Sequence, residues 1–169
     1  MQHILAPHPD DEVIGCYDIL SQYNPEDIEI VYFNTSTITN DRYNRIRDFC
    51  IYYGFKHGSI IGNIIESLSK YMSRLDSSDV LHAPDPFHEL HPFHKKIGSI
   101  VYYGRNNCEM NTCFYSTNMN APYTYEVKTP ASKKLMMDEF YDDQRSLWEY
   151  DHKYFLFEGH VRYLKPEEL

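Results

Sequence analysis

The sequence has few positive charges, no long apolar run and no closely paired cysteines. It contains 16 Lys and Arg against 25 Asp and Glu, which gives a formal net charge of −9 at pH 7. A protein that binds a nucleic-acid backbone needs clustered Lys and Arg to neutralise phosphates. The charge balance therefore argues against nucleic acid as the main partner, while it remains compatible with an acidic shell around a bound cation.

Sequence signs of a membrane or secreted protein are also missing. No apolar run reaches the roughly 18 residues needed to cross a bilayer, and we expect no signal peptide before the first strand. The cysteines do not have the CxxC spacing of a structural zinc site; they are Cys16, Cys50, Cys108 and Cys113. We therefore expect a cytoplasmic protein with reduced thiols.

The length and composition are those of an ordinary folded protein. The chain has 169 residues, of which 42% are hydrophobic and 24% charged. This is enough apolar material for a core of its own and argues against disorder. With no internal repeat or low-complexity segment to divide it, we predict one domain spanning residues 1–169.

Strand-like and helix-like runs alternate through the first two thirds of the chain. Runs rich in Ile, Val and Phe predict strands, and amphipathic spacing predicts helices between them. The predicted strands are 2–7, 28–35, 58–62, 79–83 and 112–117, and the predicted helices are 12–22, 40–53, 64–73 and 91–104. The alternation predicts an α/β fold with a Rossmann-like, mostly parallel sheet and helices on both faces. Further on, 123–128 is a candidate strand and 130–150 a charged helical stretch.

Polar clusters follow two of the predicted strands. His-Pro-Asp-Asp-Glu (8–12) follows the first strand, and His-Glu-Leu-His-Pro-Phe-His (88–94) follows the strand at 79–83. Ligands of open parallel sheets bind beyond the carboxyl ends of the strands, so we expect both clusters at one edge. Taken by itself, the first cluster could be a set of capping acids at a helix N-terminus, and the second could be a solvated loop. Their occurrence at successive strand ends favours a metal site.

The residue types in these clusters are those of a catalytic zinc site, which takes three protein ligands and leaves one position open. His8 and Asp11 are three residues apart across a strand-to-helix turn, so both can point into one crevice. Either His91 or His94 can supply the third ligand, since the two are near neighbours if a helix has begun there. Asp10 is then available as a general base that takes a proton from the attacking water.

The segment PHPDDEVIGC (7–16) resembles the opening motif of the PIG-L/LmbE family of zinc-dependent N-acetylglucosaminyl deacetylases, in which [A/P]-H-P-D-D-E follows a strand. The second motif of that family, H-P-D-H, has its counterpart in HPFH (91–94). The resemblance extends over the order of strands and helices to about residue 117. It implies a metal-dependent N-deacetylase, a hydrolase that removes the acetyl group from an N-acetylglucosamine-type sugar or its conjugate and releases a free amine.

Carried over to the matching positions, the resemblance also implies roles for single residues. His8, Asp11 and His94 would bind Zn²⁺, or another divalent transition metal such as Fe²⁺. Asp10 would be the general base. His91 would be the electrophile or acid near the oxyanion and the leaving amine.

Two further positions of the resemblance concern substrate and orientation. Arg42 lies at about the position of a family arginine that contacts substrate, with Arg45 as a nearby rival; an exposed helix charge is the simpler interpretation of either. Phe93 replaces the aspartate between the paired histidines, which removes a carboxylate that could orient His91. A zinc amidase acting on another acylated small molecule or nucleoside therefore stays open, as does a family member that binds without turnover.

Other polar and aromatic residues are predicted to be structural. We expect Glu12 to support the helix start rather than bind metal. An ordinary surface turn is expected at Glu158-Gly159-His160. Structural or loop-exposed roles are expected for His82 and His88, and core packing, with a sugar-lining role as the alternative, for Trp148, Tyr150, Tyr154 and Phe155.

Overall fold

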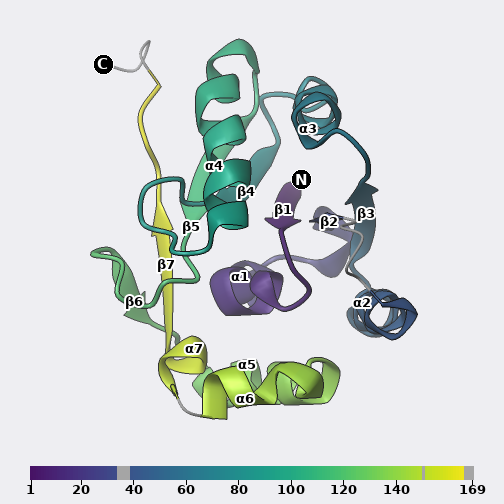
Figure 1. Ribbon diagram of the computed structural model, residues 1–169, viewed down its shortest axis with the longest axis vertical. Helices are drawn as coiled ribbons and strands as arrows, with labels where there is room; N and C mark the ends of the chain where they lie inside the picture. The colour runs from purple at the N-terminus through teal and green to yellow at the C-terminus, as the bar shows by residue number, and fades with distance from the viewer. Residues whose placement is uncertain (34–38, 150, 166–169) are drawn as a thin grey trace.

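One mixed sheet forms the centre of the molecule, with strand order β3-β2-β1-β4-β5-β7-β6 (Figure 1). The computed structural model describes residues 1–33, 39–149 and 151–165. The strands are β1 (Gln2–Ala6), β2 (Ile28–Phe33), β3 (Lys56–Ile60), β4 (Val80–Pro84), β5 (Asn111–Tyr115), β6 (Thr124–Glu126) and β7 (Phe157–Val161). The first five strands pair in parallel, whereas β7 pairs antiparallel with both β5 and β6.

Helices cover both faces of this sheet (Figure 1). One face carries α1 (Asp11–Gln22), α2 (Asn40–Tyr53) and α5 (Pro130–Phe140), and the other carries α3 (Ile64–Met72) and α4 (Pro92–Gly104). The short helices α6 (Arg145–Glu149) and α7 (Lys153–Leu156) follow α5. The predicted α/β fold with a mostly parallel sheet is therefore confirmed. Among the described helices, none is both long and apolar enough to span a bilayer.

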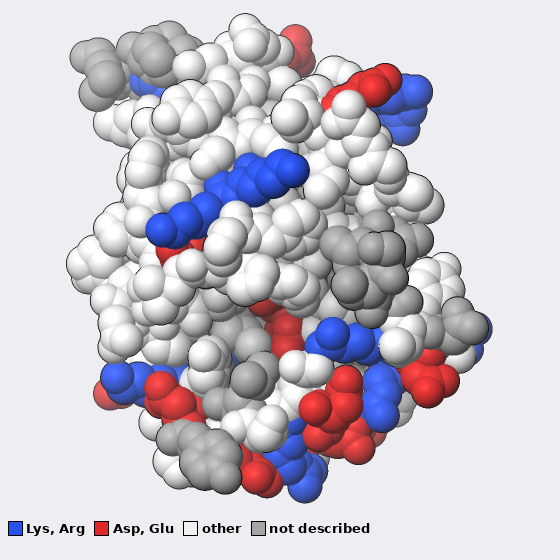
Figure 2. All heavy atoms as spheres, in the orientation of Figure 1, with Lys and Arg blue, Asp and Glu red and all other residues white. Residues whose placement is uncertain are grey.

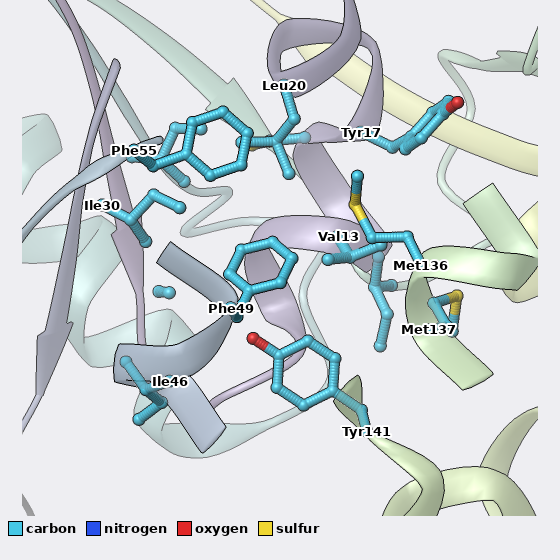
Figure 3. Close-up of a cluster of buried hydrophobic side chains, with 14 of the residues drawn as sticks. Val13, Tyr17, Leu20, Ile30, Ile46, Phe49, Phe55, Met136, Met137 and Tyr141 are labelled. Carbon is cyan, nitrogen blue, oxygen red and sulfur yellow. The ribbon is translucent and has the colours of Figure 1, made fainter. Parts of the chain in front are cut away.

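The central strands β1, β2 and β4 are buried along most of their length because helices cover both faces of the sheet. In β1, Ile4 and Ala6 face the α1 side, whereas Leu5 faces the α3 side. Figure 3 shows the core on the α1 side, where Phe49 of α2 lies between Val13 of α1 and the strand residues. The continuous hydrophobic runs in the sequence are therefore the strands that lie between the two hydrophobic cores.

Several element boundaries differ from the predictions. Residues 34–35 of the predicted strand at 28–35 lie outside the described residues. The predicted helical stretch 130–150 breaks at Tyr141, where α5 ends, and continues as a 3-10 turn (Asp142–Gln144) and α6. α2 spans the predicted residues 40–53, and Gly54 caps its end with a left-handed backbone (φ 80°).

The predicted surface turn at 158–160 is wrong, because these residues lie in β7. Glu158 is fully buried there, and its Oε1 accepts a hydrogen bond of 2.9 Å from Nζ of Lys133, which is also fully buried. The Lys133 ammonium further donates to the carbonyl oxygens of Ile14 (2.6 Å) and Phe157 (3.2 Å). A buried charged pair with this many partners holds α5, α1 and β7 together.

Candidate metal centre and active site

The two polar clusters meet at the carboxyl edge of the sheet. β1 and β4 are parallel neighbours, with Ile4 opposite His82, so the segments that follow them leave the sheet side by side. α1 begins at Asp11 and α4 at Pro92. The structure brings His8, His91 and His94 together, with one ring nitrogen of each within 4.8 Å of the others.

His8, Asp11 and His94 form a tight triangle of donor atoms. Oδ2 of Asp11 lies 3.4 Å from Nδ1 of His8 and 3.1 Å from Nε2 of His94, and the two nitrogens are 2.9 Å apart. A zinc ion with tetrahedral bonds of about 2.0–2.1 Å holds neighbouring donors about 3.3 Å apart. Two imidazoles and a carboxylate at this spacing therefore fit a divalent transition metal.

The electrostatics of the triangle also suit a cation. Burial disfavours a charged imidazole, but the carboxylates of Asp11 and Glu89 outweigh it and raise the pKa of His94 to about 10. Burial likewise opposes a charged Asp11, yet His94 and His8 hold its pKa below the usual range. The cluster is thus built around one positive charge, carried by a proton on His94, which a metal ion would replace.

Asp10 has an unusual backbone. Among the residues that the structure describes, it is the sole non-glycine with positive φ (φ 108°, ψ −28°). It occupies the N-cap position of α1, but its carboxylate makes no capping hydrogen bond and instead lines a cavity. Burial, together with Asp11 and Glu12, raises the pKa of Asp10 well above its usual range. Backbone strain and an uncapped carboxylate favour a functional role over helix capping.

Glu12 supports the strained loop from beneath. It is fully buried, and its Oε2 accepts a hydrogen bond of 3.1 Å from the backbone N–H of Asp10. Its Oε1 accepts from the hydroxyls of Tyr32 (3.0 Å) and Tyr141. Burial raises the pKa of Glu12 to about 7, although these hydroxyls oppose the shift. These contacts match the supporting role predicted for Glu12.

The positions of the paired histidines differ in a way that favours His94 as the third donor. His94 is buried, and its Nδ1 lies 3.2 Å from Oε2 of Glu89, so its Nε2 is directed at Asp11. His91 is exposed and caps α4, where its Nδ1 accepts from the backbone N–H of Phe93 (3.3 Å). Burial and the neighbouring His94 and His8 lower the pKa of His91. A neutral imidazole is therefore placed beside the donor triangle.

The carboxylate that orients a histidine comes from Glu89. In addition to its contact with His94, the Glu89 carboxylate accepts hydrogen bonds from the backbone N–H of Thr117 and from the side-chain hydroxyl of Thr117 (2.9 Å). Phe93, at the position where we expected a lost orienting group, packs on the rings of Phe33 and His8 with centroids 5.9 and 5.7 Å apart. Sequence reasoning missed Glu89; the signal was an acid five residues before the second histidine of the pair.

A cavity of about 310 Å³ opens at the donor triangle. Arg42 lies on its wall, with Nε 3.5 Å from Oδ2 of Asp143, whereas Arg45 pairs with Asp142 and is absent from the lining. Figure 2 shows charged side chains of both signs gathered at the level of α2, α5 and α6, with an acidic group inside a hollow of this face. The lining also includes Tyr154, for which core packing was expected and a sugar-lining role was the alternative, and three residues that sequence reasoning did not assign to the site, namely Ile14, Thr117 and Gln144.

The remaining predicted residues lie elsewhere. His88 contacts Oδ2 of Asp85 (2.8 Å) and is not part of this lining, and His82 is buried within β4. Trp148 is 1% exposed and belongs to the core, as predicted, and Phe155 packs against the same core. Tyr150 lies outside the described residues. The four cysteines are free thiols, also as predicted.

Comparison with known proteins identifies the fold and leaves the family unassigned. No family model matches the sequence, and no curated protein matches it. The solved structure of the conserved protein TT1542 from Thermus thermophilus superposes with a TM-score of 0.64 at 14% identity, covering 99% of this chain and 95% of that one. GalB, the 4-carboxy-2-hydroxymuconate hydratase from Pseudomonas putida, also gives 0.64, at 10% identity, covering 97% and 96%. The chain thus has the overall fold of these two proteins over almost its whole length.

Proposed function

We propose that the protein is a zinc-dependent N-deacetylase of the PIG-L/LmbE type. Its reaction would hydrolyse the acetamide of an N-acetylated amino sugar, or of a conjugate of one, to acetate and a free amine. The observation that carries the proposal is the convergence of three metal donors, from His8, Asp11 and His94, with the uncapped carboxylate of Asp10 in one cavity. The resemblance of PHPDDEVIGC to the opening motif of that family supports it.

In the first step, His8, Asp11 and His94 would hold the metal, and Asp10 would handle the proton of the water. A zinc ion held by His8, Asp11 and His94 would polarise the acyl oxygen and lower the pKa of water to about 7. Asp10 faces the same cavity and would take the proton of the attacking water. The strained backbone of Asp10 holds its carboxylate in this position before substrate arrives.

His91 would act on the other side of the substrate. Its Nδ1 accepts a hydrogen bond from the N–H of Phe93, which leaves Nε2 as the nitrogen available to substrate. A hydrogen bond from that nitrogen to the developing oxyanion is worth about 3 kcal/mol in transition-state stabilisation. The carboxyl of Asp10, protonated by the attacking water, would then supply a proton to the leaving amine.

The cavity walls suit a small polar substrate with one apolar face. Arg42 and Gln144 offer hydrogen-bond donors for hydroxyls or a carbonyl, and Tyr154 offers an aromatic ring for the face of a sugar. The volume of about 310 Å³ lies at the lower end of the range for small-molecule sites. One sugar ring with its acetamide is therefore the substrate unit that we propose.

The test is acetate release by zinc-loaded protein from a panel of N-acetylated amino sugars and sugar conjugates. We expect release with the wild-type chain and its loss with Asp10→Asn at unchanged zinc content. Asp48→Asn is the matched control, because Asp48 is exposed on α2 and bonds to Arg47. Absence of acetate from every compound, with zinc bound, would contradict the proposed substrate class.

Hydration of a carboxylate substrate is the second candidate, and two observations favour it. The chain has the fold of a hydratase, and Arg42 places a cation on the cavity wall. A base positioned to activate water serves addition to a double bond as well as attack on an amide. Loss of ultraviolet absorbance from conjugated unsaturated carboxylates, dependent on Asp10, would favour the hydratase over the deacetylase.

A further inference from the structure

A second group of metal-binding side chains lies on the sheet itself. His82 of β4 and Cys113 of β5 are paired neighbours, and His160 of β7 is paired with Tyr115, two residues beyond Cys113. One ligand atom of each of His82, Cys113 and His160 lies within 4.8 Å of the other two. None of the three lines the cavity at His94, so this group is separate from the candidate active site.

His82 is held in the form that binds metals. Its Nε2 lies 2.7 Å from Oε1 of Gln2, which accepts the ring N–H and leaves the lone pair on Nδ1. That Nδ1 is buried and has no hydrogen-bond partner among the described residues. Burial, with His160 and His3 nearby, lowers the pKa of His82 to about 3, so the ring is neutral. An unpartnered nitrogen in a buried ring is costly unless something binds it.

His160 is arranged as metal-ligating histidines commonly are, with one ring nitrogen toward the site and the other toward a carboxylate. Its Nδ1 lies 3.9 Å from Sγ of Cys113, and its Nε2 lies 3.5 Å from Oε2 of Glu158 without a hydrogen bond to any described residue. The Glu158 carboxylate is fixed in turn by Lys133 (2.9 Å) and by the backbone N–H of Asp18 (3.1 Å). The carboxylate of the buried Lys133–Glu158 pair, which joins α5 to β7, therefore lies next to the imidazole of His160.

We propose that Nδ1 of His82, Sγ of Cys113 and Nδ1 of His160 bind a second transition-metal ion of the zinc class. A thiolate with two imidazoles selects zinc or a similar borderline metal over calcium or magnesium. The ion would join β4, β5 and β7, and so fasten the antiparallel C-terminal strand to the parallel part of the sheet. Ligand atoms up to 4.8 Å apart would close by side-chain movement around it, with the fourth position taken by water.

Binding at this site exchanges protons for metal. The thiol proton of Cys113, and any proton on Nδ1 of His160, leave as the metal–sulfur and metal–nitrogen bonds form, with no change of oxidation state. Affinity for the second ion is therefore expected to fall as the solution is made more acidic.

Cobalt titration of the reduced, full-length chain tests this proposal, because only the second site contains sulfur. We expect the near-ultraviolet charge-transfer absorption of a cobalt–thiolate bond, and two metal ions per chain by elemental analysis. His94→Ala should keep this absorption and lose one ion. Cys113→Ser should lose the absorption and retain the other ion. Cys108→Ser is the matched control, since its half-buried thiol belongs to neither metal-binding group and donates to the carbonyl of Gly104 (3.7 Å), and it should retain both.

Two results would overturn the second site. One is a wild-type chain that binds cobalt without thiolate absorption, and the other is absorption that survives in Cys113→Ser. If Cys113→Ser does not fold, His82→Asn provides the second variant, because it removes the ligand nitrogen and keeps a polar side chain. Loss of one ion and of the absorption is expected there too, and retention of both would contradict the proposal. No substrate enters these measurements, so they are independent of the proposed deacetylase activity.

Discussion

Oδ2 of Asp11 lies 3.1 Å from Nε2 of His94, which links the first residue of α1 to the third residue of α4. Both side chains are nearly fully buried, and His8 completes the triangle. A buried carboxylate needs a positive charge beside it, which here is a proton on His94 or would be a bound metal ion. Removing either side chain would leave the other one buried without its partner.

Replacing His94 with Ala should abolish metal binding at the triangle, because two of its donors alone do not complete a zinc site. The measurement is zinc content after equilibration with a limiting chelator. His88→Ala is the matched control, since His88 contacts Asp85 and does not line the cavity. If His94→Ala binds as much zinc as the wild type, and its cobalt form has the same absorption spectrum, then His94 is not a ligand and the proposed ligand set is wrong.

Glu89→Gln should weaken metal binding without removing a ligand. The Glu89 carboxylate lies 3.2 Å from Nδ1 of His94 and fixes the ring so that Nε2 faces Asp11. Loss of such an orienting carboxylate commonly costs about 10–100-fold in metal affinity. Competition with a chelator of known affinity measures the change. An affinity equal to that of the wild type would mean that Glu89 holds Thr117 in place and does not orient His94.

Asp10→Gly should stabilise the fold while it removes the proposed base. Glycine adopts positive φ without a steric penalty, so the substitution relieves the strain of Asp10 at φ 108°. Such strain is worth about 1–3 kcal/mol, and we expect the free energy of unfolding to rise by an amount at the lower end of that range. Chemical denaturation of the metal-free chains measures it, with Asp10→Asn as the control that keeps a side chain. A less stable glycine variant would contradict the role of backbone strain.

Gly15→Ala should destabilise the protein strongly. A Cβ at position 15 would lie 2.2 Å from Cδ2 of Tyr115, whose ring is fixed by a hydrogen bond of 2.6 Å from its hydroxyl to the carbonyl of Leu5. Overpacking of this kind costs roughly 1–3 kcal/mol. Gly104→Ala is the matched control, because its Cβ would meet only the flexible end of Met72, at 3.3 Å. Equal melting temperatures for the two variants would show that α1 can move away from Tyr115.

Asp85 should make stability depend on pH below about 4. Its buried carboxylate accepts hydrogen bonds from the backbone N–H of Phe87 (2.7 Å) and from the hydroxyls of Tyr123 and Tyr163 (3.1 Å to Oδ2). Burial opposes ionisation, but these donors and His88 outweigh it and hold the pKa of Asp85 below its usual range. Because the folded-state pKa is lowered, the stabilisation is present above the unfolded pKa of about 3.9 and is lost as pH falls through the folded value.

Asp85→Asn isolates this contribution. The variant should be less stable than the wild type by roughly 1–3 kcal/mol near neutral pH, because it weakens a buried, charge-assisted set of hydrogen bonds. The difference should shrink as the pH is lowered below about 4, since the wild-type carboxyl then becomes protonated. Denaturation curves of both chains across this pH range measure it. A difference that is constant down to the lowest pH would assign the effect to packing instead.

The alternation of strands and helices, and the edge that carries the site, could be predicted from sequence because both depend on local patterns. Apolar runs such as ILA in β1 mark strands buried on two faces, and the polar clusters after β1 and β4 mark their carboxyl ends. β7 was missed because FEGHV places a glycine and two ionisable residues in a buried strand. Its burial depends on Lys133, which lies 25 residues before Glu158 and on another element. No local pattern reveals that partner.

The candidate site, too, could be predicted from the sequence only in part. The motif spacing was enough to select His8, Asp11 and the paired histidines, but the choice between His91 and His94 depends on which ring is buried against Glu89. Tyr154 and Gln144 reach the cavity from the region after α5, where the helix breaks at Tyr141, whose hydroxyl donates to the buried Glu12. Contacts of this long range are set by the assembled core and leave no periodic signal in the sequence.

Acetate release from N-acetylated amino sugars, measured for the zinc-loaded chain and for Asp10→Asn with equal zinc content, addresses the proposed activity itself. We predict release by the wild type and a loss of about 100-fold or more in the variant, because a positioned general base contributes about that much to the rate. Release that is unchanged in the variant would contradict the role of Asp10. No release by either chain, with zinc bound at the triangle of His8, Asp11 and His94, would contradict the deacetylase assignment.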